Sequence, residues 1–243
     1  MDTVRFSYDV YGNPVTIVRQ VTATTKPDYI FMYDKDHRLT DLKGVYSLPD
    51  PGGFDNWHRF HYKNGRIVSD TIYEFGITVN GMPAPQFPGT GIIFARDYAT
   101  FQYDAQGRIS VTVDSMANTY DEVSTYTYGK DGNLSKITTT VSDNGSGFSK
   151  DSVVTFATGY DHEVNINRTN PIWQFLDRDY SVNNRFIAGG YNGIGLPTLI
   201  TAQNATSPFL LPLPFSFFGT FLPLTIQYSC DITGTENTYA TEK

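Results

Sequence analysis

The residues best suited to chemistry in this sequence are histidines and paired carboxylates, and neither forms a pattern that identifies a reaction. His58 and His61 lie three positions apart. Side chains alternate along a strand, so these two histidines would point to opposite faces and would not bind one metal ion together. Asp177 and Asp179 could act as a general acid/base pair, but the sequence identifies no partner for them.

Other catalytic and metal-binding patterns are incomplete. Asp34 and Asp36, like the Asp177 and Asp179 pair, resemble the start of a calcium loop, but the required glycine and distal glutamate do not follow. No Gly-x-Ser-x-Gly segment marks a nucleophilic serine. The single cysteine, Cys230, excludes an internal disulfide and a cysteine-based zinc site. We therefore predict that the protein is not an enzyme and has no catalytic residue, metal or cofactor.

The composition favours strands. The chain has 243 residues, a formal net charge of −7, 17 tyrosines and 17 phenylalanines. Aromatic side chains suit the half-buried surface of a sheet. Binding of nucleic acid needs clustered lysine and arginine, which this sequence lacks. The composition therefore indicates a β protein and argues against a nucleic-acid partner.

Five segments repeat an aromatic-x-Tyr-Asp-x-x-Gly pattern, with variations. The two aromatic residues are two positions apart, so they project from one face of a strand. The Asp side chain can bond the backbone two residues on, and the Gly accepts a positive φ, so together they predict a hairpin turn. The units begin at Phe6, Phe31, Phe60, Phe101 and Tyr126, and a degenerate sixth unit surrounds Tyr160 and Asp161.

Two units depart from this pattern. The third contains Asn64-Gly65, the strongest signal for a two-residue hairpin turn. The second has His37 in place of Gly, which predicts a turn that is strained or of a different shape. Single hairpins are marginal, so neighbours must stack. We predict an all-β fold, an antiparallel meander of about five to six stacked hairpins, as a curved sheet or open barrel with one short C-terminal helix.

The repeat is interrupted in two places. Glu74 to Tyr98 is rich in Gly and Pro and predicts a long loop with one extra strand at Ile92 to Phe94. Beyond about residue 160, Asn170-Pro171 predicts the N-cap and first residue of the helix, which we expect to end at Asn183-Asn184. Gly189 to Gly195 contains too many glycines for us to expect regular structure there.

The end of the chain is apolar. Phe209 to Ile226 has no charged residue, but its three prolines make a membrane-spanning helix a poor expectation. It either completes the core or is partly exposed to a partner or a membrane surface. The last strand is predicted at Thr225 to Ile232. We expect a single domain, residues 1–243, with hairpin repeats in 1–158 and a C-terminal segment, 159–243, with the helix and closing strands.

The repeated Tyr-Asp-x-x-Gly-[Asn/Arg]-[Leu/Ile] unit resembles the YD repeat, of the RHS type, of bacterial surface proteins. The chain is also similar to a group of secreted lipoproteins from Bacteroidetes-type bacteria that combine such hairpins with a particular C-terminal segment. Here that segment shows Tyr160-Asp161, Asn170-Pro171, Ser181-Val182-Asn183-Asn184 and Gly195-Leu196-Pro197.

This resemblance implies a location in the cell envelope, in the periplasm or at the cell surface. It implies export with a signal peptide that is not in this sequence, and lipid anchoring through a cysteine near the start of the mature chain. Cys230 lies at the wrong end for that role. The resemblance supplies no activity and no catalytic residue. It implies contact with a membrane only through the lipid anchor.

Three functional hypotheses follow. The first is a non-enzymatic binding or structural module of the envelope, with a glycan or an envelope protein as its partner. The second is glycan binding through exposed aromatic residues where the repeat breaks, because the repeat aromatics themselves are expected to form the sheet core. The third is a hydrolase that uses paired carboxylates. The candidate glycan-binding residues are Tyr73, Phe75, Tyr98, Trp173 and Tyr191.

Overall fold

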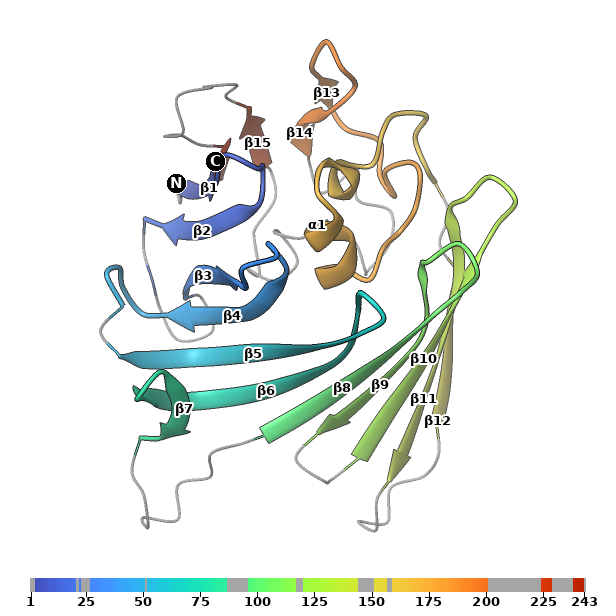
Figure 1. Cartoon of the computed structure of the whole chain (residues 1–243). Coiled ribbons are helices and arrows are strands. Elements are labelled where there is room, and N and C mark those ends of the chain that lie inside the picture. Colours follow the sequence, from blue (N-terminus) through green and yellow to red (C-terminus); the bar gives the residue numbers. More distant parts are fainter. Residues whose placement is uncertain are drawn as a thin grey trace. The chain divides into compact units, whose positions relative to one another are not determined.

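The computed structural model describes residues 3–20, 22, 27–50, 52–86, 96–116, 120–143, 151–156, 159–200, 224–228 and 238–242 (Figure 1). In these residues the regular structure is almost entirely antiparallel β-strand, with one short α-helix. The predicted all-β meander of hairpins with a short C-terminal helix is therefore confirmed. The chain divides into two compact units. Unit 1 contains residues 1–21, 126–137 and 154–243, and unit 2 contains residues 22–125 and 138–153.

Unit 2 is a meander in which each strand of the main path pairs with the next. A short side strand, β7 (Met82–Pro85), pairs with the end of β6. The main path is β3 (Asp28–Tyr33), β4 (Leu39–Val45), β5 (Gly53–Lys63), β6 (Arg66–Val79), β8 (Arg96–Tyr103), β9 (Ile109–Met116) and β10 (Tyr120–Tyr128). Strands β11 (Leu134–Asp143) and β12 (Asp151–Phe156), like β10, lie partly in this unit and partly in unit 1.

The hairpin turns follow the predicted chemistry. Asp104 Oδ1 accepts hydrogen bonds from the backbone N–H of Gln106 and of Arg108, each at 2.9 Å. Asp34 does the same in the second unit, where His37 adopts a φ of 59°. The His37 turn thus keeps the shape of the glycine turns, so of the two alternatives predicted for it, a different shape is excluded. What remains is the strain of a positive φ at a residue with a Cβ.

Two further turns are two-residue hairpins with positive φ at both positions, 52° and 75° at Asn64-Gly65 and 51° and 73° at Asn80-Gly81. The first was predicted. The second was not, because Glu74 to Tyr98 was expected to be one long loop; instead, β6 runs on to Val79 and β7 folds back on it. The predicted strand at Ile92 to Phe94 lies outside the described residues.

The repeat aromatics of unit 2 form its core, as expected. Phe31, Phe60 and Phe101 are buried, and the strand register places them on one face. The tyrosines link successive hairpins. Tyr62 donates its hydroxyl to the carbonyl of Leu39 at 3.0 Å, and Tyr103 donates to Ile67 at 2.7 Å.

The arginine after each of two turns completes this link between hairpins. The Arg38 guanidinium lies 5.2 Å from the centre of the Tyr62 ring, and that of Arg66 lies 5.3 Å from the Tyr103 ring. Such cation–π contacts add to the hydrogen bonds. Burial raises the pKa of Tyr62 and of Tyr103 to about 12. Each hairpin therefore supplies a carbonyl acceptor and a cation for the tyrosine of the next.

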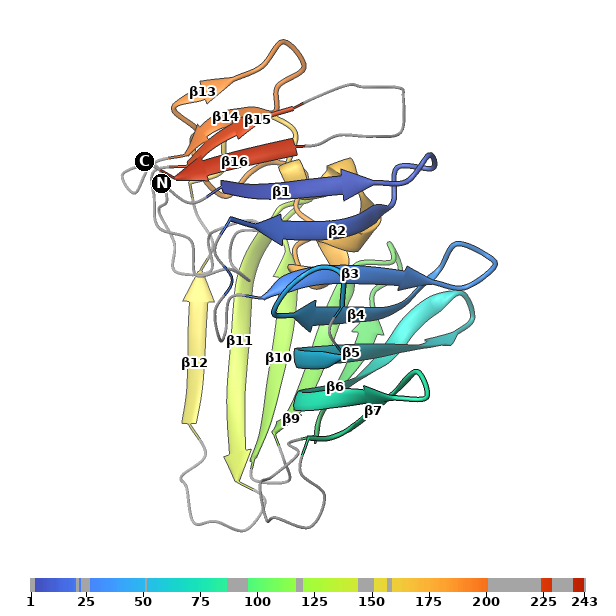
Figure 2. The same cartoon turned by 90° about the vertical axis from the view of Figure 1, so that its left-hand side faces the viewer.

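In unit 1 the two ends of the chain meet in one sheet. Figure 2 shows β1 (Thr3–Tyr8) beside β16 (Thr238–Glu242), and Thr3 lies opposite Thr241. The strand order is β2 (Pro14–Arg19), β1, β16, β15 (Leu224–Gln227), β14 (Pro197–Ile200) and β13 (Gly190–Tyr191). The last predicted strand corresponds in part to β15, and β16 was not predicted. Residues 229–237 and 201–223, with most of the apolar Phe209 to Ile226 stretch, lie outside the described residues.

Strands β13 and β14 form a hairpin that the sequence reading missed, so the expectation of irregular structure at Gly189 to Gly195 is wrong. Asn192 replaces the turn Asp, and its Oδ1 accepts from the N–H of Ile194 at 3.1 Å and of Leu196 at 2.9 Å. Gly195 has the expected positive φ of 80°. The link to the next hairpin is also present, because Tyr228 donates to the carbonyl of Pro197 at 2.8 Å.

The helical part of unit 1 consists of a 3-10 turn, η1 (Ile166–Thr169), and α1 (Pro171–Leu176). Asn170 is the N-cap as predicted, and its side chain accepts from the N–H of Ile172 at 2.8 Å. The helix ends at Leu176 rather than at Asn183-Asn184, because Arg178 takes a φ of 52° that cannot continue a right-handed helix. In the described part of the chain, no helix has the length and apolar character needed to cross a membrane.

Candidate functional site

Tyr73 and Tyr98 lie on the same face of two paired strands in unit 2. Tyr98 lies opposite Thr71, and Tyr73 is two residues further along β6, so the two tyrosines are diagonal neighbours. Tyr98 is 41% exposed, while Tyr73 is partly buried. Sequence reasoning selected both residues as exposed aromatics in the insertion. The sequence alone could not show that they are neighbours, because β6 pairs with β8 although β7 lies between these strands in the sequence.

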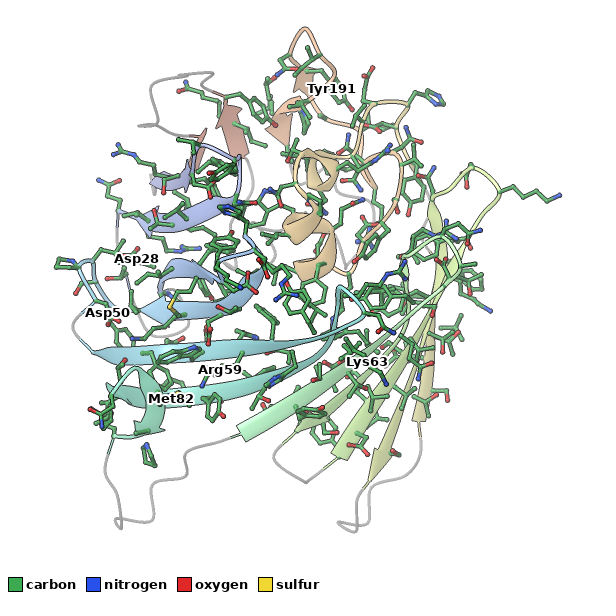
Figure 3. All side chains as sticks on the ribbon, in the orientation of Figure 1. Asp28, Asp50, Arg59, Lys63, Met82 and Tyr191 are labelled. Atoms are coloured by element: carbon green, nitrogen blue, oxygen red, sulfur yellow. The ribbon has the colours of Figure 1, made fainter. Side chains whose placement is uncertain are left out.

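Arg59 of β5 belongs to the same face. It lies opposite Thr71, on the side away from Tyr98. Its Nε donates to Asp41 Oδ1 at 2.9 Å. Its Nη1 contacts Met82 Sδ of β7 at 3.1 Å, and Figure 3 labels both Arg59 and Met82. Arg59, Tyr73 and Tyr98 thus surround the buried Thr71 on three adjacent strands. Sequence reasoning missed Arg59 because its position depends on these pairings.

Trp57 lies on the same face. It lies opposite Tyr73 and is buried, and its indole N–H donates to Asp41 Oδ1 at 2.8 Å. The Lys43 ammonium lies 4.8 Å from the centre of the Trp57 ring. Lys43 is itself buried and bonded to Asp50 and to Thr78. The Trp57 and Lys43 side chains are therefore held within the protein, and the exposed part of the face belongs to the tyrosines and Arg59.

Phe75 marks the bend of β6 next to this face. It has a φ of 51° and is 46% exposed. A Cβ on the following residue, Gly76, would come within 2.3 Å of the Phe54 ring, so only glycine fits there. The exposed ring of Phe75 agrees with the prediction that it is an exposed aromatic. Its positive φ indicates that the residue also shapes the bend of β6.

The other two candidate aromatics belong to unit 1 and have structural contacts. Trp173 is 3% exposed and packs edge-on against Phe6 at a ring distance of 6.1 Å, so the expectation that it is an exposed aromatic is wrong. The position is set by the short helix, which turns its apolar side to β1. Tyr191 is partly buried and donates its hydroxyl to Asp161 Oδ2 at 2.7 Å. Neither residue presents an open aromatic surface.

Carboxylates gather on the face of unit 2 that is opposite to the tyrosines. Glu74 alternates with Tyr73 along β6, and Asp97 is its diagonal neighbour on β8. Burial, followed by the charges of Asp97 and Asp55, raises the pKa of Glu74. On the same face, His58 Nδ1 lies 2.7 Å from Asp70 Oδ2. The arrangement could supply a proton donor, and sequence reasoning did not identify it.

The two histidines are placed as predicted. His58 lies on the sheet face against Asp70, and His61 is exposed on the opposite face, because the register of β5 and β6 is regular between them. Within the residues the structure describes, no group of three or more His, Cys, Asp or Glu side chains could hold a metal ion.

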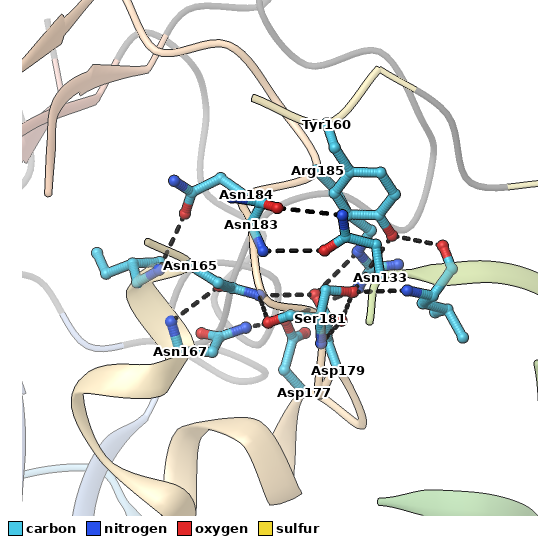
Figure 4. Close-up of polar contacts among 12 residues, drawn as sticks. Asn133, Tyr160, Asn165, Asn167, Asp177, Asp179, Ser181, Asn183, Asn184 and Arg185 are labelled. Carbon is cyan, nitrogen blue, oxygen red and sulfur yellow. Dashed lines mark hydrogen bonds and ion pairs between the residues drawn. The ribbon is translucent and has the colours of Figure 1, made fainter. Parts of the chain in front are cut away.

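Unit 1 contains a buried polar network, shown in Figure 4. Its centre is Arg185, whose Nε donates to Asp179 at 3.0 Å and whose Nη2 lies 4.0 Å from Asp177. Burial opposes the charge of Arg185, but Asp179 and Asp177 hold its pKa above the usual value. The two carboxylates proposed as an acid/base pair are thus engaged by one buried guanidinium.

The Ser-x-Asn-Asn segment is the second part of this network. Asn183 and Asn133 exchange hydrogen bonds of 2.9 and 3.1 Å across a separation of 50 residues (Figure 4). Ser181 Oγ accepts from the N–H of Leu134 at 3.0 Å, and Asn184 Oδ1 accepts from the N–H of Ile166 at 2.9 Å. The segment therefore ties the fifth turn to the helical region, which is a structural role.

Tyr160 and Asp161 also belong to this network rather than to a sixth hairpin. Tyr160 donates to the carbonyl of Leu134 at 2.6 Å, as the other linking tyrosines do. Asp161 Oδ1 accepts from the N–H of Glu163 at 3.1 Å, as in the other turns, but its carboxylate is also bonded by Asn184 and Tyr191 and no hairpin follows. The degenerate unit keeps the tyrosine link but not the hairpin.

Comparison with known proteins gives no identification: no family model and no curated protein sequence matches this chain.

Proposed function

We propose that this protein is a non-enzymatic binding module of the cell envelope and that it binds a glycan through Tyr73 and Tyr98. The observation that carries the proposal is the placement of both rings on one face of paired strands, with Tyr98 41% exposed. Aromatic rings offer sugars a flat apolar surface with polar edges. Cβ atoms of diagonal neighbours on paired strands lie about 7–8 Å apart, which lets two rings contact successive sugars of one chain.

Buried side chains next to the tyrosines support the view that the binding surface is rigid. Trp57, Asp41 and Lys43 lie on the same face as the tyrosines, are buried, and contact each other or neighbouring strands. Sites built on strands hold their side chains more firmly than sites on loops. A ligand therefore meets a preformed surface and needs little reordering of the protein.

The test uses the whole chain on a glycan microarray, followed by calorimetric titration with the glycans that bind. Tyr98→Ala should weaken binding at least about tenfold, because ring stacking and area burial are both lost. Tyr73→Ala should weaken it less, because that ring is already partly buried. The matched control is Tyr11→Ala, an exposed tyrosine in the first hairpin turn, which should bind as the wild type does. Absence of binding to any glycan at millimolar concentration would contradict the proposal.

The location in the envelope rests on the resemblance to secreted lipoproteins with YD repeats. Its test is separate: the natural gene should encode a signal peptide and a lipid-accepting cysteine upstream of the present Met1. Cell fractionation with an antibody to the protein should then recover it with the envelope. Recovery only with the cytoplasm would contradict this part of the proposal.

A second candidate is a carboxylate-dependent hydrolase, and the raised pKa of Glu74 beside Asp97 favours it. A protonated Glu74 could donate a proton to a leaving group. The protein would then release reducing sugars from polysaccharides, and Glu74→Gln would abolish that release, while the exposed control Asp36→Asn would not. Equal, background-level release by the wild type and by Glu74→Gln would exclude this candidate.

A further inference from the structure

We propose that the glycan bound at this face carries a carboxylate, as a uronic acid does, and that Arg59 binds that carboxylate. The inference rests on the proposed glycan-binding function and names the ligand class of the same site. It starts from the position of Arg59, which faces Tyr98 across Thr71 on three adjacent strands and is a diagonal neighbour of Tyr73.

The guanidinium of Arg59 is fixed on one side only. Asp41 Oδ1 accepts both the Arg59 Nε at 2.9 Å and the Trp57 indole N–H at 2.8 Å, so the carboxylate cannot move with the arginine. The Arg59 side chain is 29% exposed, whereas that of Asp41 is 11% exposed. The arginine is therefore anchored through its inner nitrogen and remains accessible at its outer end.

The outer end lacks a strong acceptor. Besides the Nε bond to Asp41, the structure gives the Arg59 guanidinium one contact among the described residues, from Nη1 to Met82 Sδ at 3.1 Å. A thioether sulfur is a weak acceptor. The paired Nη1 and Nη2 groups match the two oxygens of a carboxylate, which they can bind through two parallel hydrogen bonds.

Lys43 lies on the same face but cannot replace this interaction. Lys43 is buried and bonded to Asp50, so it does not reach a ligand on the surface. The whole chain carries a formal net charge of −7, so it does not attract acidic polymers in general. A preference for an acidic glycan would therefore have to come from a local cation such as Arg59.

The experiment uses the whole chain and a microarray of paired oligosaccharides that have the same backbone with and without a uronic acid, such as xylan and glucuronoxylan fragments. Calorimetric titration then measures the affinities of the bound pairs. The wild type should bind the uronate-bearing member about tenfold or more tightly than the neutral member, as expected for hydrogen bonds to a charged group. Arg59→Gln should remove that preference, so that the two members of a pair bind with equal affinity.

Lys63→Gln is the matched control, because it removes one positive charge from the same strand at an exposed position (Figure 3). It should keep the preference. Arg59→Lys keeps the charge but lacks the paired donors, and should retain only part of the preference. If the Arg59 variants fail to fold, the wild type is titrated at low and high salt, where the preference for the uronate should fall as salt rises.

The outcomes separate the two proposals. Binding of both members with equal affinity, or a preference that survives Arg59→Gln, overturns the uronate inference and leaves the glycan-binding function standing. Absence of binding to every member of the array overturns the glycan-binding function as well. A preference lost in Arg59→Gln and kept in Lys63→Gln supports the inference.

Discussion

Two arginine–aspartate groups in this protein have the same chemistry and opposite surroundings. Arg185 of unit 1 is 6% exposed and lies between Asp177 and Asp179 in a buried network. Arg59 of unit 2 bonds Asp41 on its inner side, while its outer side reaches the surface beside Tyr98. Residue types alone therefore do not distinguish a structural arginine–aspartate group from one that can bind a ligand. The difference depends on whether the guanidinium N–H groups of the arginine are hydrogen-bonded to buried acceptors or remain accessible at the surface.

The largest expected effect comes from removing the buried arginine. Arg185→Met should destabilise the protein by about 3–5 kcal/mol, because Asp177 and Asp179 would remain buried without their cation. The measurement is the free energy of unfolding from urea titration followed by circular dichroism. Arg59→Gln should cost less, about 1–2 kcal/mol in the same assay, because the buried Asp41 keeps its hydrogen bond from the Trp57 indole N–H. Similar decreases in the free energy of unfolding of the two variants would contradict this difference between Arg185 and Arg59.

A smaller effect tests the tyrosine links that both units share. The pKa values of Tyr62, Tyr103 and Tyr160 are raised to about 12, chiefly by burial, above the usual value near 10. In an unfolded chain these hydroxyls lose their protons at a lower pH than in the folded protein. Their contribution to stability is therefore complete below pH 10 and is lost as the pH rises toward 12.

The melting temperature should accordingly fall between pH 9 and pH 12 as these tyrosines titrate. A triple variant with Phe at the three positions lacks the hydroxyls, so its stability at pH 8 should be lower, by about 1 kcal/mol for each lost hydrogen bond. Its melting temperature should then change less with alkaline pH. An equal slope in both proteins would show that the linking tyrosines do not carry the effect.

The smallest effect concerns the one hairpin turn of this type, among those described, that has a side chain at the left-handed position. His37→Gly should stabilise the protein by about 1 kcal/mol, because glycine adopts a φ of 59° without strain. Gly107→Ala, at the equivalent position with a φ of 83°, should destabilise it by a similar amount. Both are read from urea unfolding. If His37→Gly is less stable than the wild type, the contacts of the histidine side chain contribute more to stability than the positive φ costs.

Local chemistry explains what the sequence could predict. The Asn64-Gly65 turn and the Asn170 N-cap depend on a few adjacent residues, so their patterns were sufficient. The turn at Asn192 was not predicted, because the many glycines of Gly189 to Gly195 indicated irregular structure, although Asn offers the same acceptor oxygen as Asp. The sequence signal was present: Tyr191, Asn192 and Gly195 have the spacing of the repeat.

The candidate site could be predicted only in part. Tyr73, Phe75 and Tyr98 were selected because they lie where the repeat breaks, and two of them proved to share a face. Arg59 could not be selected, because its role depends on pairing with strands that lie before and after it in the chain. The hydrogen bonds between Asn133 and Asn183 could not be predicted either, because the two residues are 50 positions apart in the sequence. Local patterns identify turns and caps, whereas these contacts are fixed by which strands become neighbours.

The pairing of β1 with β16 has a consequence for how the chain can be cut and rejoined. Thr3 lies opposite Thr241, so these two residues, which are close to the ends of this sequence, are about one strand spacing, roughly 5 Å, apart. A short flexible linker can therefore join the two ends of this sequence, and a new start can be opened in an exposed turn such as Ala105-Gln106. Such a circularly permuted chain would keep every strand beside its present neighbours. We therefore expect the permuted chain to adopt the same fold, because moving the first residue to another turn leaves all strand pairings unchanged.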